Sequence, residues 1–538
     1  MRLKRLLNPW PEAPLPLWMI FPVIFAALYA THFKLMNLPY YWDEAGYYIP
    51  AAWDFFRTGS AIPVSTVSNA HPPLPSLYLA LWWKTSGFLP WVTREAVLLV
   101  AALGLLGVWR LAMRLTGVAS VAFWTALLTG LYPVWFAQST LAHADIFAAA
   151  CALWGMVYSL PRRGRRPAVA FVWFAAASLC KETAIVVPLT VGLVDFIEGW
   201  CHHPPARRRL WREAGWMIAS VAPLGGWYLY HHARTGYFFG NPEFLRYNAE
   251  ATLDPLRILA AFGHRVLHVT VHMNLFVPVF IGLAALLLSP RPDAEGRERA
   301  SITRFSMLRI FALLLASAIF FSFLGGALLT RYLLPMYPLV LLLALMTMYR
   351  RVPYWQAIAV LSAGAFIAGL FINPPYGFAP EDNLAYADVI HMDMDGIAQL
   401  RRRYPDAVVL TAWPMSDDLT KPELGYVKKP WDIVRLEDFT AQQIKVAAKE
   451  QEKYSAALVF STKYEPPPSL FSMVSKSEER MNERYFGLHH DLPPEQIAAR
   501  LNGTLVWQEQ KQGMWVALLR FDRQLEARAD TRAASLRH

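Results

Sequence analysis

Charged residues are scarce in this sequence of 538 residues. They make up 17% of the chain, whereas a soluble domain averages about 25%, so too little polar material is present to cover a water-facing surface. Hydrophobic residues make up 55%, including 21 Trp and 31 Phe. The apolar excess ends near Phe371, and the composition after it is that of soluble protein. The chain is therefore expected to begin with a membrane domain and to end with a polar one.

Cysteine is also rare, and nucleotide-binding motifs are missing. Cys151, Cys180 and Cys201 lie in or beside apolar runs, and their spacing fits neither a disulfide framework nor a metal–thiolate site. We find no phosphate-binding glycine loop and no Walker pattern, so soluble nucleotide chemistry is not indicated. The net charge of +11 does not indicate a nucleic-acid partner, because much of it lies in short clusters between apolar segments, as in membrane proteins.

Long apolar runs predict a polytopic α-helical membrane protein with about eleven transmembrane helices. A span needs about 20 mostly apolar residues. The predicted spans are 15–33, 95–113, 118–137, 142–160, 167–180, 183–199, 213–230, 265–289, 307–325, 332–349 and 353–373. The fifth and sixth are short and could form one bent hairpin. The first follows three cations and resembles a signal peptide, but many spans follow it, so we interpret it as an uncleaved span.

Arginine clusters in the short loops predict the orientation. With the amino terminus in the cytoplasm, the inner loops are rich in arginine and the short outer loops carry single cations or none. The inner clusters are Arg110 and Arg114; Arg162, Arg163, Arg165 and Arg166; Arg207, Arg208, Arg209 and Arg212; Arg291, Arg297, Arg299, Arg304 and Arg309; and Arg350 and Arg351. This register places the carboxy terminus outside.

The predicted topology leaves two large loops and the tail on the outer side. The membrane domain covers residues 1–375 and includes outer loops at about 34–94 and 231–264. Residues 376–523 are expected to form an extracytoplasmic α/β domain, and residues 524–538 a frayed polar end. The expected strands are Ala407–Trp413, Ala456–Ser461, Thr504–Gln508 and Trp515–Phe521, and the expected helices are Leu384–Arg403 and Ala441–Lys453.

Two adjacent acids open the first outer loop. Asp43 and Glu44 follow the first span and precede a stretch whose apolar residues, from Ile49 to Phe56, recur at helical spacing. This pattern predicts a helix in the membrane interface that holds both carboxylates at the headgroup level, where they are candidate catalytic residues. The alternative is that Asp43 caps the helix and Glu44 lies in its first turn, favoured by the helix dipole.

His71 and Asp145 are further candidates on the outer side. Three of the four residues after His71 are prolines, which make a rigid turn. A histidine held by such a turn could bind an anion or a metal, or simply be exposed. Asp145 lies at the outer mouth of the fourth span, where it could orient a sugar or a cation, or cap the helix.

Lys181, Glu182, Arg331 and Tyr332 complete the set of polar residues at outer helix ends. Ionisable residues at membrane depth are costly, so each is a candidate for function. Lys181 and Glu182 lie between two short spans and could form only an internal ion pair. Arg331 and Tyr332 open the tenth span. The planar guanidinium of Arg331 could pair with a lipid phosphate or act as an ordinary interfacial anchor.

These motifs, taken together, resemble the GT-C superfamily of membrane glycosyltransferases. Its characteristic order is matched by Asp43-Glu44 after the first span, His71-Pro72-Pro73-Leu74, Lys181-Glu182-Thr183 and Arg331-Tyr332-Leu333-Leu334-Pro335. The nearest groups are the protein O-mannosyltransferases and the bacterial aminoarabinose transferases that modify lipid A, although the latter tend to have Lys where His71 stands. The resemblance covers roughly residues 15–375.

The resemblance implies a hexosyl- or pentosyltransferase of the bacterial inner membrane. Such enzymes move a sugar from a polyprenyl-phosphate donor to a hydroxyl of a lipid, glycan or protein acceptor on the outer, periplasmic face. Asp43 would be the catalytic base, with Glu44 beside it, in a single inverting displacement. Arg331, and more weakly Lys181, would hold the donor phosphate. The other candidates for substrate binding are His71, Asp145, Glu182 and Tyr332.

Some questions stay open at the level of sequence. A divalent cation could assist, since acids and a histidine are present, but no spacing demands one. The main alternative function is a transporter or flippase for a lipid-linked or anionic substrate, in which the charged residues would mark a path. Their position at outer loop ends rather than at mid-span, and the lack of an internal repeat, favour the transferase. A third interpretation is a structural or sensory membrane protein whose tail binds a partner.

Overall fold

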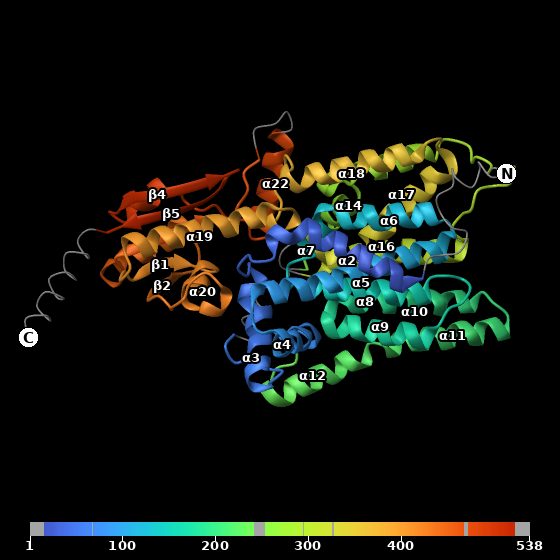
Figure 1. Ribbon diagram of the computed structural model, residues 1–538, viewed down its shortest axis with the longest axis horizontal. Coiled ribbons are helices and arrows are strands. Elements are labelled where there is room, and N and C mark those ends of the chain that lie inside the picture. The colour runs from blue at the N-terminus through green and yellow to red at the C-terminus, as the bar shows by residue number, and fades with distance from the viewer. Residues whose placement is uncertain are drawn as a thin grey trace, which may run out of the picture. The chain divides into compact units, whose positions relative to one another are not determined.

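The computed structural model describes residues 16–66, 68–240, 253–293, 295–324, 328–466 and 472–521 (Figure 1). The chain divides into two compact units. The first consists of Met1–Met36 and Pro50–Ile372, and the second of Asn37–Ile49 and Asn373–His538. The second unit is therefore built from two separate stretches of sequence. The expected polar end at 524–538 lies outside the described residues.

The first unit is a bundle of apolar helices around α5 (Pro90–Thr116). Pro90 suits the first turn of α5, where its missing N–H has no role, and Gly117 ends the helix in the left-handed conformation at φ 69°. The helix is largely buried and contacts α2, α6 and α8. The other helices are α2 (Leu17–His32), α6 (Ala119–Leu131), α7 (Pro133–Gln138), α8 (Ala144–Ser159), α9 (Pro167–Cys180), α10 (Val186–Trp200), α11 (Pro204–Ala219), α12 (Ala222–Thr235), α14 (Pro255–Thr270), α15 (Phe276–Ala285), α16 (Arg304–Phe323), α17 (Tyr337–Arg351) and α18 (Trp355–Phe371).

Helices lie along all of the predicted spans, but several are broken. Pro133 begins α7 and separates it from α6. The segment predicted as one span at 265–289 is bent by 104° between α14 and α15, where Met273 and Asn274 have positive φ angles of 47° and 67°. Within the described residues, four helices are long and apolar enough to cross a membrane, or five if the bent pair counts as one span. The number eleven therefore remains a prediction.

Large apolar side chains are exposed on the outside of the first unit. Val23 on α2, Leu193 on α10, Phe311 on α16 and Leu361 on α18 are examples. A water-soluble protein rarely exposes apolar patches of this extent, whereas a helix that faces lipid exposes apolar side chains to the hydrocarbon chains around it. The surface of the bundle is thus suited to a bilayer.

The segment after the first span forms helices of its own. The helix expected from Ile49 onward is confirmed as α3 (Ile49–Thr58). A second helix, α4 (Leu74–Ser86), begins directly after the proline turn that follows His71, and the sequence interpretation did not foresee it. Pro75 lies in the first turn of α4 and needs no hydrogen-bond partner there.

The second unit contains a mixed sheet with strand order β2-β1-β3-β5-β4 within the described residues. Its strands are β1 (Val409–Ala412), β2 (Ile433–Leu436), β3 (Ala456–Ser461), β4 (Thr504–Lys511) and β5 (Met514–Arg520). Strand β1 pairs in parallel with β2 and β3, and β5 pairs antiparallel with β3 and β4. Four of these strands match predicted ones. Strand β2 was missed because it is short and partly exposed, without clear alternation.

Helices complete the second unit. They are α19 (Ala385–Arg403), α20 (Met415–Thr420), α21 (Ala441–Lys449), α22 (Ser472–Tyr485) and α23 (Pro494–Arg500). The buried face of α19 packs on β3, β4 and β5. Gly396 permits this approach, because a Cβ there would lie 2.8 Å from Val516 on β5. The sequence-predicted helices at 384–403 and 441–453 correspond to α19 and α21.

Candidate functional site

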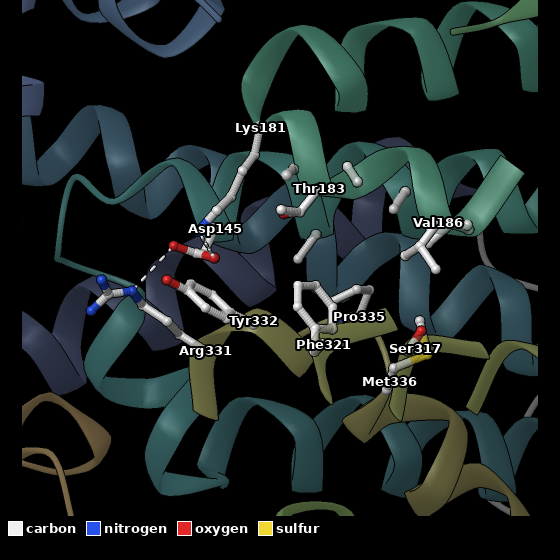
Figure 2. A pocket seen from close by; sticks show the side chains of 15 residues that line it. Asp145, Lys181, Thr183, Val186, Ser317, Phe321, Arg331, Tyr332, Pro335 and Met336 are labelled. Carbon is white, nitrogen blue, oxygen red and sulfur yellow. Dashed lines mark hydrogen bonds and ion pairs between the residues drawn. The ribbon is translucent and has the colours of Figure 1, made fainter. Parts of the chain in front are cut away.

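A small cavity in the first unit brings together four of the candidate residues (Figure 2). Its volume is about 30 Å³, enough for an ordered water or two. Asp145 lies in the first turn of α8, Lys181 directly follows α9, and Arg331 and Tyr332 belong to a short 3-10 turn, η5 (Thr330–Leu333). Residues far apart in the sequence thus line one space.

Close packing of α8 on α9 sets the distance between Asp145 and Lys181. The two helices are joined by a short loop, so the start of α8 lies beside the end of α9. At Gly155 an added Cβ would lie 2.3 Å from the ring of Phe174, so only glycine allows the helices to approach this closely. Asp145 and Lys181 thereby come into direct contact beside the cavity.

Asp145 lies between two cations. Its Oδ1 accepts a hydrogen bond of 2.5 Å from Nζ of Lys181, and its Oδ2 lies 3.2 Å from Nε of Arg331. The contact with Arg331 is an ion pair without the alignment of a hydrogen bond, since the terminal nitrogens of the guanidinium point away from the carboxylate in Figure 2. All three side chains are buried. The trio carries a formal charge of +1, which favours an anionic ligand.

Tyr332 forms one wall of the cavity. Nζ of Lys181 lies 4.2 Å from the centre of its ring, a cation–π contact, and the ring stacks on Phe321. The buried Arg265 of α14 lies over the same ring at 5.8 Å and donates to the carbonyl of Leu329 at 2.8 Å. The ring therefore fixes the position of the Lys181 ammonium.

His71 and Glu182 form a second pair. Nδ1 of His71 lies 3.0 Å from Oε2 of Glu182. The expectation that His71 might simply be exposed is wrong, because its side chain is only 16% exposed. Nor do Lys181 and Glu182 form an internal ion pair, as considered from the sequence. They are neighbours in the chain, but Lys181 pairs with Asp145 and Glu182 pairs with His71.

Asp43 and Glu44 belong to the second unit. Glu44 is fully buried and its Oε2 accepts a hydrogen bond of 2.9 Å from the backbone N–H of Tyr41. Asp43 occupies the position before a short π-helical turn, η2 (Glu44–Tyr48), but its side chain makes no capping hydrogen bond. Of the two acids, Asp43 is the partly exposed one.

The segment that carries these acids packs against the carboxy-terminal part of the chain. The N–H of Tyr40 donates to the carbonyl of Leu424 at 3.1 Å. The rings of Trp42 and Trp413 lie edge to face at 4.9 Å, and a Cβ at Gly46 would lie 2.9 Å from Trp413. The sheet domain therefore holds the Asp43–Glu44 segment in place.

Two buried acids of the second unit were not foreseen from the sequence. Burial raises the pKa of Asp393 on α19 well above its usual value, and burial together with the nearby Asp393 charge does the same to the pKa of Asp418 on α20. The pKa of Tyr426 is also raised well above its usual value, by burial and by the charges of Asp418, Asp393 and Glu44. Hydropathy gives little signal for such residues, because α19 is a polar amphipathic helix.

Other functional candidates were missed although a signal existed. Arg94 and Arg265 are fully buried, and Arg94 donates to the carbonyl of Thr140 at 2.6 Å. Asp195 and Arg309 are fully buried as well and hydrogen-bond to each other. Asp195 lies within a predicted apolar span, and that position alone marks it as a candidate.

Metal binding finds no direct support in the described residues. Among them, no group of three or more His, Cys, Asp and Glu side chains is arranged to hold a metal ion. A divalent cation, considered from the sequence, therefore stays an open alternative.

Comparisons with known proteins bear on the whole arrangement. Residues 70–224 match the family described as dolichyl-phosphate-mannose-protein mannosyltransferase. No curated protein is a significant match to the sequence. The crystal structure of ArnT from Cupriavidus metallidurans in the apo state is 15% identical, with a TM-score of 0.51 over 93% of this chain and 97% of that chain. The structure of ArnT bound to undecaprenyl phosphate has the same identity and coverage and a TM-score of 0.52.

The chain has the fold of a GT-C membrane glycosyltransferase. The resemblance seen in its motifs is thereby confirmed, by sequence over residues 70–224 and by fold over most of the chain. The expectation of an integral membrane protein is confirmed at the same level. The bacterial inner membrane, the orientation and the roles of the individual site residues remain predictions.

Proposed function

We propose that this protein transfers a sugar from a polyprenyl-phosphate donor to an acceptor hydroxyl on the outer face of the bacterial inner membrane. The observation that carries the proposal is that two buried cations, Lys181 and Arg331, both contact Asp145 and line one cavity. A surplus of positive charge in a buried space suits a phosphate group. The binding of undecaprenyl phosphate to ArnT, which has the same fold, supports this assignment.

The proposed reaction is a single displacement with inversion at the anomeric carbon. Asp43 accepts the proton of the acceptor hydroxyl as its oxygen forms the new bond to that carbon. The bond between the anomeric carbon and the phosphate oxygen breaks, and the polyprenyl phosphate leaves with the bonding electrons. Arg331 and Lys181 stabilise the charge that develops on the leaving phosphate.

The environments of the two adjacent acids support Asp43 rather than Glu44 as the base. Glu44 is buried and already accepts the N–H of Tyr41, so its carboxylate orders the segment. Asp43 is partly exposed and does not serve as a helix cap. We assign Glu44 to positioning this segment.

The remaining candidates are assigned to substrate binding. Tyr332 orients the Lys181 ammonium, and Asp145 holds both cations when no phosphate is present. His71 and Glu182 are partly exposed, and Glu182 directly follows Lys181 in the chain, so this hydrogen-bonding pair suits sugar hydroxyls. The acceptor is a lipid, glycan or protein, and the sugar is a hexose or pentose.

Donor affinity tests the proposal. Arg331→Lys should weaken the binding of a polyprenyl phosphate, because an ammonium cannot form two parallel hydrogen bonds. Arg331→Ala should weaken it further, by about 1.5–3 kcal/mol for a lost charge-assisted hydrogen bond. Lys181→Ala should act in the same direction, and the double variant should be non-additive if both cations hold one phosphate.

A matched control is available in the same unit. Arg257 is also buried, but it donates to the carbonyls of Ser322 and Leu324 and does not line the cavity. Arg257→Ala should leave donor affinity unchanged. Wild-type affinity in Arg331→Ala would refute the phosphate role, and a lack of sugar transfer from any polyprenyl-phosphate donor in detergent would favour a transporter or flippase.

A further inference from the structure

A second and much larger cavity lies at the opposite ends of the helices that form the site. Its volume is about 410 Å³, within the range of ordinary ligand pockets. Helix α8 begins at the Asp145 cavity and ends at Ser159, and the loop after it brings Arg162 and Arg165 to the second cavity. Helix α16 begins at the second cavity with Arg304 and reaches the first with Phe321. The two cavities are thus a helix length apart, about 25–30 Å.

The walls of the second cavity carry a surplus of guanidinium groups. Among its described lining residues are four arginines, Arg162, Arg165, Arg209 and Arg304, and two glutamates, Glu198 and Glu213. The formal charge of these six side chains is +2.

Both glutamates are already engaged. Glu213 is buried and accepts from Arg165 at 2.5 Å and from Arg209 at 2.9 Å. Glu198 accepts a hydrogen bond of 2.6 Å from Arg309, which lies behind the cavity wall. Among the described ion pairs, each acid is held by other arginines and neither contacts the remaining two arginines of the wall.

Arg162 and Arg304 are those remaining arginines. They come from separate segments, the loop after α8 and the first residue of α16, and both are exposed. Within the described part of the chain, no hydrogen bond or ion pair involves either side chain. A guanidinium group offers parallel N–H donors that match the oxygens of a phosphate.

The rest of the wall is apolar. Leu210, Phe305 and Leu308 line the cavity beside the arginines, and Leu308 is exposed on the surface of the bundle. An apolar wall next to a guanidinium cluster suits a phosphate that is attached to an acyl chain, as in basic pockets between membrane helices that bind anionic headgroups. A free phosphate ion would use the arginines alone.

We propose that this cavity is a binding site for a phosphate group, separate from the sugar-transfer site. Arg162 and Arg304 contact the phosphate oxygens, while the paired Arg165 and Arg209 hold the glutamates that shape the wall. The phosphate is carried either by an anionic membrane lipid or by a soluble phosphate. The proposal does not depend on sugar transfer, because no residue of the Asp145 cavity contributes to it.

Binding to the full-length protein in phosphatidylcholine nanodiscs tests the proposal in two arms. In the first arm phosphatidylglycerol is titrated into the discs, and in the second inorganic phosphate is added to the solution. The double variant Arg162→Gln with Arg304→Gln should lower the affinity for the bound species by tenfold or more. Saturable binding of phosphatidylglycerol alone identifies the ligand as a lipid headgroup. Saturable binding of inorganic phosphate alone identifies it as a soluble phosphate.

A charge-matched control separates a specific site from general attraction. Arg163→Gln with Arg208→Gln removes two exposed arginines from neighbouring positions that do not line the cavity. This control should bind as the wild type does. Equal losses in the two double variants would reduce the cluster to an orientation signal and overturn the proposal, as would a lack of saturable binding in both arms. Thermal unfolding of both variants, expected to match the wild type, shows that neither loss reflects misfolding.

Discussion

Two clusters of buried charge in the first unit differ in how their charges balance. In the Asp145 cluster, one acid lies between Lys181 and Arg331. In the Asp195 cluster, Asp195, Glu198 and Glu213 are paired with Arg165, Arg209 and Arg309. When only these side chains are counted, the formal charge of the first cluster is +1 and that of the second cluster is zero.

We interpret the difference as one between a proposed ligand site and a network that holds helices together. Arg309 on α16 binds Asp195 and Glu198 on α10, and Arg165 links Asp195 to Glu213 on α11. Every acid in that network has a cation, as a structural ion network requires in a low dielectric. In the Asp145 cluster, two cations contact the same acid and line a cavity, an arrangement that suits an anionic ligand.

Side-specific labelling should sharpen this comparison with an all-or-none result, since the clusters are expected on opposite sides of the membrane. The native Cys201, exposed between α10 and α11 beside the Asp195 cluster, should react with an impermeant reagent only after lysis. In a Cys201→Ser background, Lys445→Cys on the exposed side of α21 should react in intact cells. Labelling of Cys201 from outside would reverse the predicted orientation.

Removal of one acid from each cluster should have the next largest effect. Asp195→Asn leaves two buried arginines without their shared carboxylate and should destabilise the protein by about 3–5 kcal/mol, measured by thermal unfolding in detergent. Asp145→Asn should also destabilise it, because two cations then face each other.

The two variants should respond differently to a polyprenyl phosphate. A bound ligand stabilises the folded state in proportion to its affinity. The ligand should raise the unfolding temperature of Asp195→Asn as much as that of the wild type, since the donor site is intact. The ligand should raise the unfolding temperature of Asp145→Asn by more than that of the wild type, because the Asp145 carboxylate no longer competes with the phosphate for Lys181 and Arg331. An equal response in both variants would show that the charge surplus of the Asp145 cluster has no bearing on ligand binding.

A third contrast concerns the adjacent acids of the second unit. Asp43→Asn keeps the shape of the side chain but removes its proton affinity, so turnover should fall roughly a hundredfold or more. Glu44→Gln keeps an oxygen that can accept the N–H of Tyr41 and should cost much less. Donor binding should survive in both, and a polyprenyl phosphate titration checks this. Normal turnover of Asp43→Asn would leave this residue without a catalytic role.

The sequence predicted the members of the Asp145 cluster better than their pairing. Asp145, Lys181 and Arg331 stand at helix ends on one predicted side, so their proximity followed from topology alone. The choice of Asp145 rather than Glu182 as the partner of Lys181 depends on how closely α8 packs on α9, which hydropathy does not encode.

Long-range packing also explains what was missed. The Asp195 cluster was overlooked, although Asp195 and Glu198 lie one turn apart within an apolar segment. The grouping of residues 37–49 with the carboxy-terminal domain joins segments more than 300 positions apart, which no local pattern predicts. The strand order of the sheet cannot be predicted from local patterns either, because it depends on pairing between distant segments. Four of the strands, in contrast, were predicted from their composition.

The smallest expected effect concerns two buried acids of the second unit, Asp393 and Asp418. Unlike Asp195, neither forms a hydrogen bond or an ion pair with a cation among the described residues. Burial raises the pKa of both Asp393 and Asp418 in the folded protein. One oxygen of each lacks a hydrogen-bond partner among the described residues, and burial favours the protonated form of both carboxyl groups. Besides burial, the charge of Asp393 and then that of Asp417 raise the pKa of Asp418, and Lys421 opposes the rise.

The sign of the pH dependence follows from these raised values. Between the unfolded and folded pKa of each aspartate, the folded state binds more protons than the unfolded state, so stability is greatest at low pH and falls as pH rises through the folded pKa. Asp418→Asn removes this ionisation and should raise the unfolding temperature of the second unit at pH 8 by roughly 2–4 °C, the shift that about 1 kcal/mol produces in a domain of this size. Asp432→Asn, at an exposed aspartate of the same unit that is not among the charges acting on Asp418, is the matched control and should retain the wild-type pH dependence. Thermal unfolding followed between pH 5 and pH 9 distinguishes the two, and a pH dependence that is unchanged in Asp418→Asn would show that its carboxyl group is ionised throughout.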